Sequence, residues 1–330
     1  MYTLNPSFGL VLVLCLGFTT VNASYGDRSK FFINCVRGCL SQNCTDDGLS
    51  FQPSHTIKQE FFNELLFWSC SDECSYNCMW RTTNAFITRN WPVPQFYGKW
   101  PFARFLGIQE PASVVFSILN FLSHLWMIRQ FRNDVRRDSP MFYVWHVFCA
   151  ICLNGWIWSA VFHTRDFPIT ELCDYSFAYS IVLSTCCLMV LRMFHKTSLL
   201  VKTAFAVVSL LYFVNHFANL STGSFDYDYN MKANVATGVV SGIGWIIWYL
   251  FQRRKRTYAW KMLAFQLLAA CSLLLELNDF PPIFWTFDAH SIWHLSTVPL
   301  TFLLYSFAID DCKALRREKF EAVDDKEKLI

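Results

Sequence analysis

The chain has 330 residues, of which 54% are hydrophobic and only 16% are charged. Soluble globular proteins carry about 25% charged residues, so this composition is too apolar for water alone, and it excludes intrinsic disorder, collagen and coiled coil. The 28 basic and 25 acidic residues give a formal net charge of +3, which is too balanced for a nucleic-acid partner. The composition predicts a protein that lies in a membrane.

The first 23 residues have the form of a secretory signal peptide. An apolar stretch over 8–18 leads to Val21-Asn22-Ala23, a small-residue end of the kind that signal peptidase cleaves. No Lys or Arg precedes the apolar stretch, which departs from the usual pattern. The alternative is an uncleaved anchor, but the stretch is shorter than the ~20 residues that a membrane span needs. We expect a cleaved signal peptide over 1–23.

A polar, cysteine-rich segment follows over 24–109 and is expected to form a lumenal domain. Six cysteines in an oxidising compartment favour disulfides over free thiols. Their spacing places thiols one helical turn apart, which predicts two short helices stapled together, although the pairing stays open. A zinc site is the alternative, but no His is interleaved and the tighter CxxC turn of common zinc modules is missing. The six are Cys35, Cys39, Cys44, Cys70, Cys74 and Cys78.

This segment also contains one glycosylation sequon. Asn43-Cys44-Thr45 fits the N-x-[ST] acceptor pattern. A disulfide at Cys44 would hinder modification, so the sequence leaves the glycosylation of Asn43 undecided.

Beyond Glu110 the composition changes to apolar runs of spanning length, separated by short polar turns. The fold class expected is all-α integral membrane, a seven-transmembrane helix bundle over 110–310 preceded by the disulfide-rich lumenal domain. A large soluble helical protein is remote, because so few charges interrupt the runs. The predicted spans are 111–129, 141–163, 173–193, 198–217, 232–251, 258–277 and 290–309.

The charges of the loops predict the orientation of the bundle. The loops after the first, third and fifth runs, and the tail over 311–330, are rich in Lys and Arg, whereas the alternate loops hold few. Basic loops stay in the cytosol, so we expect a lumenal N-terminus and a cytosolic C-terminus. The chain ends Lys326-Glu327-Lys328-Leu329-Ile330, which has the K-x-K-x-x form of a retrieval signal on early secretory membrane proteins.

Five polar residues fall at the lumenal ends of three predicted spans. They are Ser159 and His163 at the end of the second, Asp174 at the start of the third, and His290 and His294 at the start of the seventh. Ionisable residues in spans cost about 2.5 to 3.5 kcal/mol on insertion scales and mark functional sites by default. Residues four apart share a helix face, so the two pairs can each point together toward one site.

This constellation predicts a zinc site. His163, His290 and His294 supply the three protein ligands of a catalytic zinc ion, which keeps one position open for water. Asp174 could orient a ligand or handle a proton, and Ser159 could donate a hydrogen bond to a developing oxyanion. Any one of these histidines alone would more often only form hydrogen bonds at the interface. Their joint placement at one depth favours the metal site.

Other polar residues near this layer have open roles. Glu110 has the position of an ordinary carboxylate at a helix start. Asn120 and Ser123 could support the site or simply form hydrogen bonds between helices. Glu276 lies near the same layer. The cysteines within the spans are expected to be packed thiols.

Several motifs resemble one family of membrane proteins, the Per-like GPI-phospholipase family. This family lies within the CREST superfamily of seven-span membrane hydrolases, which includes alkaline ceramidases and adiponectin receptors. The superfamily's zinc ligands and catalytic residues match His163, His290 and His294, together with Ser159 and Asp174. The motifs are Phe96 to Phe105, Gln109 to Ser113, Trp158 to Asp166, Phe225 to Asn230, Asp279 to Trp285 and Asp288 to Thr297.

The resemblance implies an activity and a location. The family implies removal of an unsaturated fatty acid from the sn-2 position of GPI-anchored proteins, which would be the substrates together with their lipid. It implies a Golgi membrane, and the K-x-K-x-x tail leaves open some cycling through the endoplasmic reticulum. Two alternatives remain. One is a non-enzymatic seven-span receptor or chaperone for GPI-proteins with a structural metal, and the other is a ceramidase-like amide hydrolase.

Overall fold

The computed structural model describes residues 24–223 and 225–327, and every named element in them is an α-helix. The predicted signal peptide over 1–23 and the last three residues of the K-x-K-x-x tail lie outside the described residues. The helices are α2 (Lys30–Asn43), α3 (Phe61–Leu65), α4 (Cys70–Thr88), α5 (Pro111–Asp134), α6 (Phe142–Thr164), α7 (Pro168–Met193), α8 (Leu199–Ser221), α9 (Tyr227–Gln252), α10 (Trp260–Leu277) and α11 (Ala289–Glu327).

The chain forms two compact units. The N-terminal unit runs through Ile108 and also contains Leu277–Ala289, whereas the helical bundle comprises Gln109–Glu276 and the chain from His290 onward. The segment between α10 and α11 therefore packs with the cysteine-rich region. Asp279 accepts hydrogen bonds from Gln95 Nε2 at 2.6 Å and from Trp100 Nε1 at 2.5 Å. Ala103 N donates to Trp285 O at 2.9 Å.

Three disulfides join α2 to α4 in the N-terminal unit, as predicted. The pairs are Cys35–Cys78, Cys39–Cys74 and Cys44–Cys70. Rising numbers on α2 meet falling numbers on α4, so the two helices are antiparallel. Serine caps start both helices, at Ser29 and Ser69. Each crosslink closes a long loop, which is worth about 3.5 to 4 kcal/mol in the chain-entropy account.

The disulfides exclude the zinc alternative for this region. The sulfurs of Cys44, Cys70 and Cys74 lie close enough together for a metal site, but Cys44 is bonded to Cys70 and Cys74 to Cys39. A sulfur in a disulfide is no longer a thiolate, which is the form that binds a metal.

The structure places the sequon asparagine in the interior. Asn43 is only 4% exposed, and its Nδ2 donates to Cys39 O at 3.0 Å. Its Oδ1 accepts hydrogen bonds from Thr56 N at 2.8 Å and from Thr56 Oγ1 at 3.0 Å. A glycan on Nδ2 does not fit this arrangement, because the amide is already enclosed and hydrogen-bonded.

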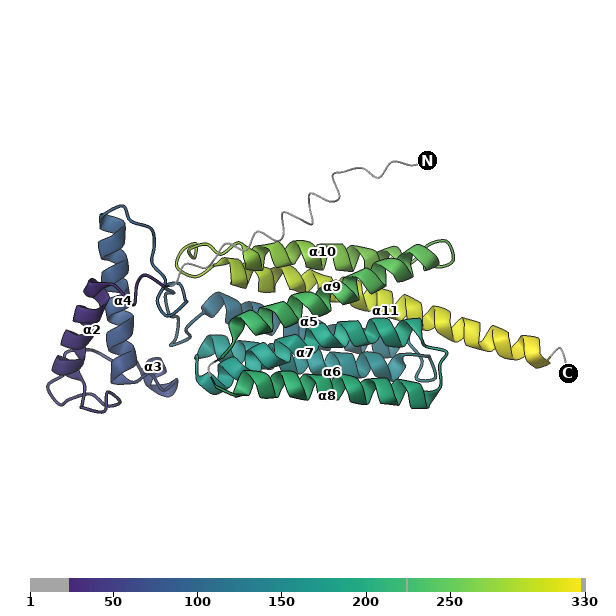
Figure 1. Cartoon of the computed structure of the whole chain (residues 1–330), viewed down its shortest axis with the longest axis horizontal. Coiled ribbons are helices and arrows are strands. Elements are labelled where there is room, and N and C mark those ends of the chain that lie inside the picture. Colours follow the sequence, from purple (N-terminus) through teal and green to yellow (C-terminus); the bar gives the residue numbers. More distant parts are fainter. Residues whose placement is uncertain (1–23, 224, 328–330) are drawn as a thin grey trace. The chain divides into compact units, whose positions relative to one another are not determined.

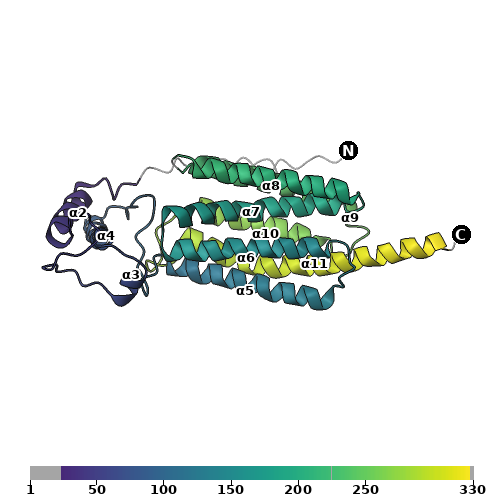
Figure 2. The same cartoon turned by 90° about the horizontal axis from the view of Figure 1, so that it is seen from below.

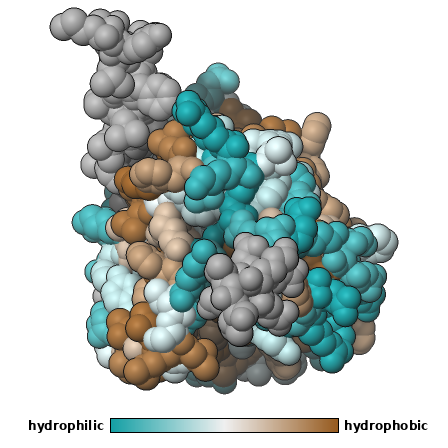
Figure 3. Space-filling view, turned by 90° about the vertical axis from the view of Figure 1, so that its right-hand side faces the viewer, coloured by the Kyte–Doolittle hydropathy of each residue, from teal (hydrophilic) through white to brown (hydrophobic). Residues whose placement is uncertain are grey.

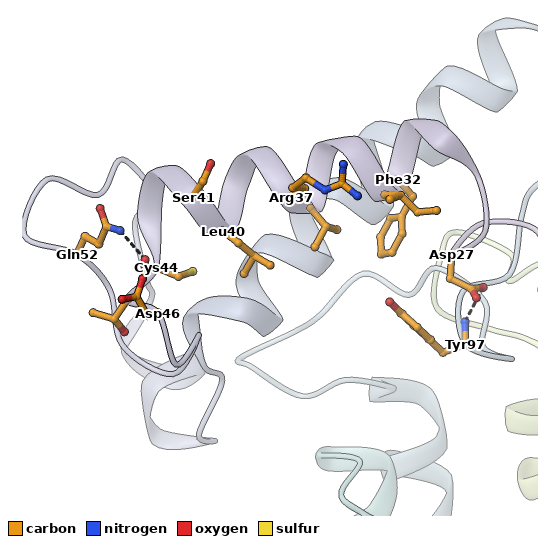
Figure 4. Close-up of a pocket in the computed structure, with 12 residues that line it drawn as sticks. Asp27, Phe32, Arg37, Leu40, Ser41, Cys44, Asp46, Gln52 and Tyr97 are labelled. Carbon is orange, nitrogen blue, oxygen red and sulfur yellow. Dashed lines mark hydrogen bonds between the residues drawn. The ribbon is translucent and has the colours of Figure 1, made fainter.

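A pocket of about 670 Å³ lies along α2 (Figure 4). Tyr97 lies near one end, where its backbone N donates to Asp27 Oδ1 at 3.1 Å. Gln52 lies near the other end, and its Nε2 donates to Cys44 O at 2.6 Å. The first bond joins the loop after α4 to the chain before α2, and the second joins the loop after α2 to the end of that helix.

The bundle unit consists of long helices that lie alongside one another (Figures 1 and 2). Six helices in the described residues are long and apolar enough to cross a membrane: α5, α6, α7, α8, α9 and α11. Aromatic side chains fill the interior, where Trp145, Trp245, Tyr305 and Phe307 are at most 2% exposed. Many apolar side chains of α8 and α9 face outward instead, as expected for helices that contact lipid.

The predicted count of seven spans is not confirmed. α10 covers most of the predicted span over 258–277 but has only 18 residues, and it is not among the six candidate spans of the described chain. Lys261 near its start donates to Ser306 Oγ on α11 at 2.7 Å, so α10 packs within the bundle. α11 has 39 residues and continues without a break from the predicted seventh span into the tail.

Candidate functional site

The starts of α5 and α11 and the end of α6 meet at one end of the bundle. Gln109 N donates to Thr164 O and Glu110 N donates to His163 O, each at 3.0 Å, which joins the start of α5 to the end of α6. Pro111 then opens α5, a position where its missing N–H costs nothing. His290 and His294 lie in the first turns of α11. The three predicted histidines therefore come from helix ends that lie together.

The structure brings the three predicted histidines together. His290 Nε2 lies 3.3 Å from His163 Nε2 and 3.0 Å from His294 Nε2. A tetrahedral zinc ion bound at about 2.0 to 2.1 Å from each nitrogen would separate its nitrogen ligands by about 3.3 Å. The two distances from His290 Nε2 are close to this value, and one ligand atom from each of the three histidines lies within 4.8 Å of the others, so the group can hold a metal.

Each histidine is held through its other ring nitrogen. His163 Nδ1 lies 2.7 Å from Glu110 Oε2, and His290 Nδ1 lies 2.7 Å from Glu276 Oε2. An ionised carboxylate only accepts hydrogen bonds, so both Nδ1 atoms carry the proton. The Nε2 atoms are then bare acceptors that face one another, an arrangement that a cation between them stabilises. Carboxylate partners of this kind orient metal-binding histidines and raise their basicity.

The third histidine is held by a serine that the sequence analysis did not single out. Ser117 Oγ on α5 lies 3.0 Å from His294 Nδ1 and 3.0 Å from Ser159 Oγ. Its own proton goes to Ser113 O at 2.7 Å, so Ser117 accepts from both neighbours. Ser159, the predicted oxyanion donor, is therefore one hydroxyl away from the histidine cluster and is 5% exposed.

Asn120 fixes the start of α11 against α5. Its Nδ2 donates to His294 O at 2.8 Å, and its Oδ1 accepts from Thr297 Oγ1 at 3.1 Å. Asn120 is fully buried. Of the two roles that the sequence allowed, the structure therefore shows a hydrogen bond between helices that also positions a cluster residue. Ser123, by contrast, donates to Asn120 O within its own helix at 2.7 Å.

Asp174 lies on α7, which contributes none of the three histidines. It is half-buried. The ring of its neighbour Tyr175 packs edge-on against Phe162 at a centroid distance of 6.1 Å, and Phe162 directly precedes His163. Helix α7 thus borders the end of α6 that carries the cluster. The role of Asp174 in proton handling stays a prediction.

The cluster is buried on one side and open on the other. His163 and His294 are each 2% exposed, whereas the side chains of His290 and Glu276 are 32% and 24% exposed. The ring of Trp156 meets His294 edge-on at 5.3 Å between centroids, which gives the buried side an apolar wall. A ligand can approach from the side of His290.

The fold and this cluster define a class, a multi-pass helical membrane protein with a three-histidine group suited to a metal. The sequence pattern of the Per1-like family matches residues 60–312. The chain belongs to the Per1-like family, which confirms the resemblance inferred from its motifs.

Three curated relatives show how far this similarity extends. The chain is 53% identical to Post-GPI attachment to proteins factor 3 of Drosophila melanogaster over 298 residues, which cover 90% of this chain and 91% of the relative. It is 41% identical to the proteins named GPI-specific phospholipase A2-like PGAP3 of Mus musculus and Homo sapiens. Those matches cover 93% and 96% of this chain, and 95% and 98% of the relatives. No solved structure matches the chain.

Proposed function

We propose that the chain remodels GPI anchors by hydrolysing the sn-2 acyl ester of GPI-anchored proteins. The relatives' names refer to GPI attachment and to a GPI-specific phospholipase A2-like protein, which supports the substrate class. One observation supports zinc-dependent hydrolysis. Three imidazole Nε2 atoms converge at zinc-ligand spacing while each Nδ1 is held by its own partner.

The proposed ligands of the zinc ion are His163, His290 and His294. Glu110 and Glu276 each hold one of these imidazoles at 2.7 Å. Their two negative charges balance the two positive charges of zinc, which lowers the free-energy cost of burying the ion. Zinc bound there makes water nucleophilic near neutral pH and polarises a carbonyl group.

The remaining roles fall to residues of the chain around the ligands. The Ser159 hydroxyl, which now donates to Ser117 Oγ, can turn to donate to an ester carbonyl oxygen as negative charge develops on it. Asp174 accepts or returns the proton that moves during hydrolysis. The wall formed by Trp156 limits the water on the buried side, and the exposed edge of His290 faces the entering lipid.

The position of the cluster at the helix ends suits a phospholipid ester. A spanning helix ends near the boundary between hydrocarbon and headgroups, and the acyl ester of an inositol phospholipid lies at that boundary. We propose that this end faces the lumen of the Golgi, with α10 as a seventh span, a cleaved signal peptide and a cytosolic C-terminus. The K-x-K-x-x tail would allow cycling through the endoplasmic reticulum.

The cluster supports an enzyme over a receptor with a structural metal. Structural zinc sites usually have four protein ligands, whereas catalytic sites keep one position open. The histidine group in the described residues has three members, and its His290 side is partly exposed. A ceramidase-like amide hydrolase would use a similar site. The choice of an ester rather than an amide substrate therefore rests on the names of the relatives.

The test uses cells that lack the endogenous protein. Each variant is expressed, and the sn-2 chains of GPI-anchored proteins are measured by mass spectrometry. We expect wild type and His146→Ala to restore remodelling, because His146 lies at the start of α6, away from the cluster. His294→Ala should leave the unsaturated chains in place. Full remodelling by His294→Ala at wild-type abundance would contradict the proposal.

A further inference from the structure

A second candidate site lies at the end of the bundle away from the histidines. A pocket of about 490 Å³ opens between the turn that follows α5, the turn before α10, and α11. Helix α5 has 24 residues, so its two ends are about 36 Å apart at about 1.5 Å per residue. The hydrocarbon core of a bilayer is ~30 Å thick, which places this pocket in the opposite headgroup layer.

Basic side chains line this pocket from two elements. Arg136 comes from the turn after α5, and Lys313, Arg316 and Arg317 come from α11. Lys313 lies three residues before Arg316 and four before Arg317, so it shares a helix face with both. Arg317 is exposed and has no ion pair among the side chains that the structure describes. Figure 3 shows hydrophilic residues gathered over a large part of this end of the molecule.

The acidic residues of the pocket leave a positive balance. Asp310 is paired with Lys261 at 2.5 Å, and Lys261 lies outside the pocket lining. Asp134 lies 3.8 Å from Lys313, a loose contact between partly exposed groups that is worth little. Asp138, beside the pocket, is paired with Arg316 at 3.1 Å. The four basic side chains of the lining are therefore opposed by Asp134 and Asp138, and two positive charges are left over. Such a lining attracts an anion.

A buried hydroxyl at the same pocket also lacks a partner. Ser139 is only 6% exposed, yet its Oγ forms no hydrogen bond with the described residues. An unpaired buried hydroxyl is unfavourable, so a ligand that accepts a hydrogen bond from it would recover that loss. Nearby, Arg316 Nε holds both carboxylate oxygens of Asp138 at 3.1 Å, and this contact lowers the pKa of Asp138. Arg316 thus fixes the turn that carries Ser139.

We propose that this pocket binds a phosphomonoester group, presented by the headgroup of an anionic membrane lipid. A phosphomonoester offers about two negative charges and three acceptor oxygens, which match the surplus cations and the free hydroxyl. Basic pockets beside transmembrane helices commonly bind phosphorylated inositol headgroups. The depth of the pocket favours a lipid over a soluble phosphate, and its volume is sufficient for such a headgroup. This site is independent of hydrolysis at the other end.

Binding is tested on full-length protein in nanodiscs of phosphatidylcholine. Separate preparations contain in addition either phosphatidylinositol 4-phosphate or unphosphorylated phosphatidylinositol, and bound lipid is counted by native mass spectrometry. We expect retention of the phosphorylated lipid at least about 10-fold above the unphosphorylated one. Equal retention of the two would overturn the proposal. So would equally tight binding of soluble inositol phosphate or inorganic phosphate by detergent-solubilised protein, because it would assign the site to a free phosphate.

Three variants separate binding in the pocket from the effect of general surface charge. Lys313→Ala/Arg317→Ala should lower retention about 10-fold or more, whereas Arg254→Ala, an exposed basic residue outside the pocket lining, should not. Ser139→Ala should weaken lipid binding without lowering the melting temperature of the lipid-free protein, because its hydroxyl has no partner to lose. Equal losses in the Arg254→Ala and pocket variants, or unchanged lipid binding by Ser139→Ala, would refute the assignment.

Discussion

Replacing Glu110 by Gln removes one of the two carboxylates that hold the histidine cluster and keeps the size of the side chain. Glu110 Oε2 lies 2.7 Å from His163 Nδ1, and the two side chains are only 7% and 2% exposed. In the proposed site, Glu110 and Glu276 supply the two negative charges that balance zinc. The variant therefore leaves one positive charge unbalanced on the buried side of the cluster.

The expected loss follows from this geometry. Removing a carboxylate partner of a metal-binding histidine lowers metal affinity by about 10- to 100-fold, which corresponds to about 1.4 to 2.8 kcal/mol. Because the Glu110 pair is buried, we expect about 100-fold for Glu110→Gln. The Glu276–His290 pair has the same 2.7 Å distance, but its side chains are 24% and 32% exposed. Solvent screens that pair, so Glu276→Gln should lose only about 10-fold.

The assay is zinc competition with a chelating dye on full-length protein in detergent. Glu171→Gln is the matched control, because Glu171 lies in the first turn of α7 and its carboxylate bonds to Tyr227 rather than to a histidine. Its zinc affinity should equal that of wild type. Equal losses in Glu110→Gln and Glu276→Gln, or wild-type affinity in Glu110→Gln, would contradict the proposed role of the buried carboxylate.

Three further variants test neighbouring claims. Ser159→Ala should keep zinc but lose about 100-fold or more in the rate of acyl release, the scale of one oxyanion donor; a wild-type rate would exclude that role. Asn120→Leu removes the hydrogen bond to His294 O and one more interhelical hydrogen bond, each worth about 0.6 kcal/mol in a membrane. The melting temperature in detergent should therefore fall, and an unchanged melting temperature would contradict a stabilising role of these bonds. Asn43→Gln should have the same electrophoretic mobility as wild type, with or without glycosidase treatment, because the Asn43 amide is enclosed. A higher mobility of the untreated variant would show that wild type carries a glycan there.

The sequence predicted the helical class and the use of the cysteines, but not how they pair. Spacing of one helical turn places Cys35 and Cys39 on one helix face. The pairing depends on the direction in which α2 passes α4. That direction is set by packing between segments more than 25 residues apart in the chain, so local spacing could not reveal it.

The parts of the candidate site made of residue types that are rare in membrane helices were predictable, and the parts made of common residue types were missed. Histidines in membrane spans are costly, so His163, His290 and His294 stood out, and the structure brings them together. A serine in a membrane helix costs little free energy, so Ser117 gave no signal by itself. Its spacing from Asn120 on one helix face was the available clue. The partner of Glu110 could not be foreseen, because Glu110 and His163 are 53 positions apart.

The proposed zinc-dependent hydrolysis is tested by measuring acyl release by the purified protein from a GPI-anchored substrate with a labelled sn-2 chain. We expect protein containing one zinc ion per chain to release the labelled fatty acid, a chelator to stop the release, and added zinc to restore it. His163→Ala should bind less zinc and release none. Release from the sn-1 position, release that survives complete removal of zinc, or no release by fully zinc-loaded wild type would contradict the proposed activity.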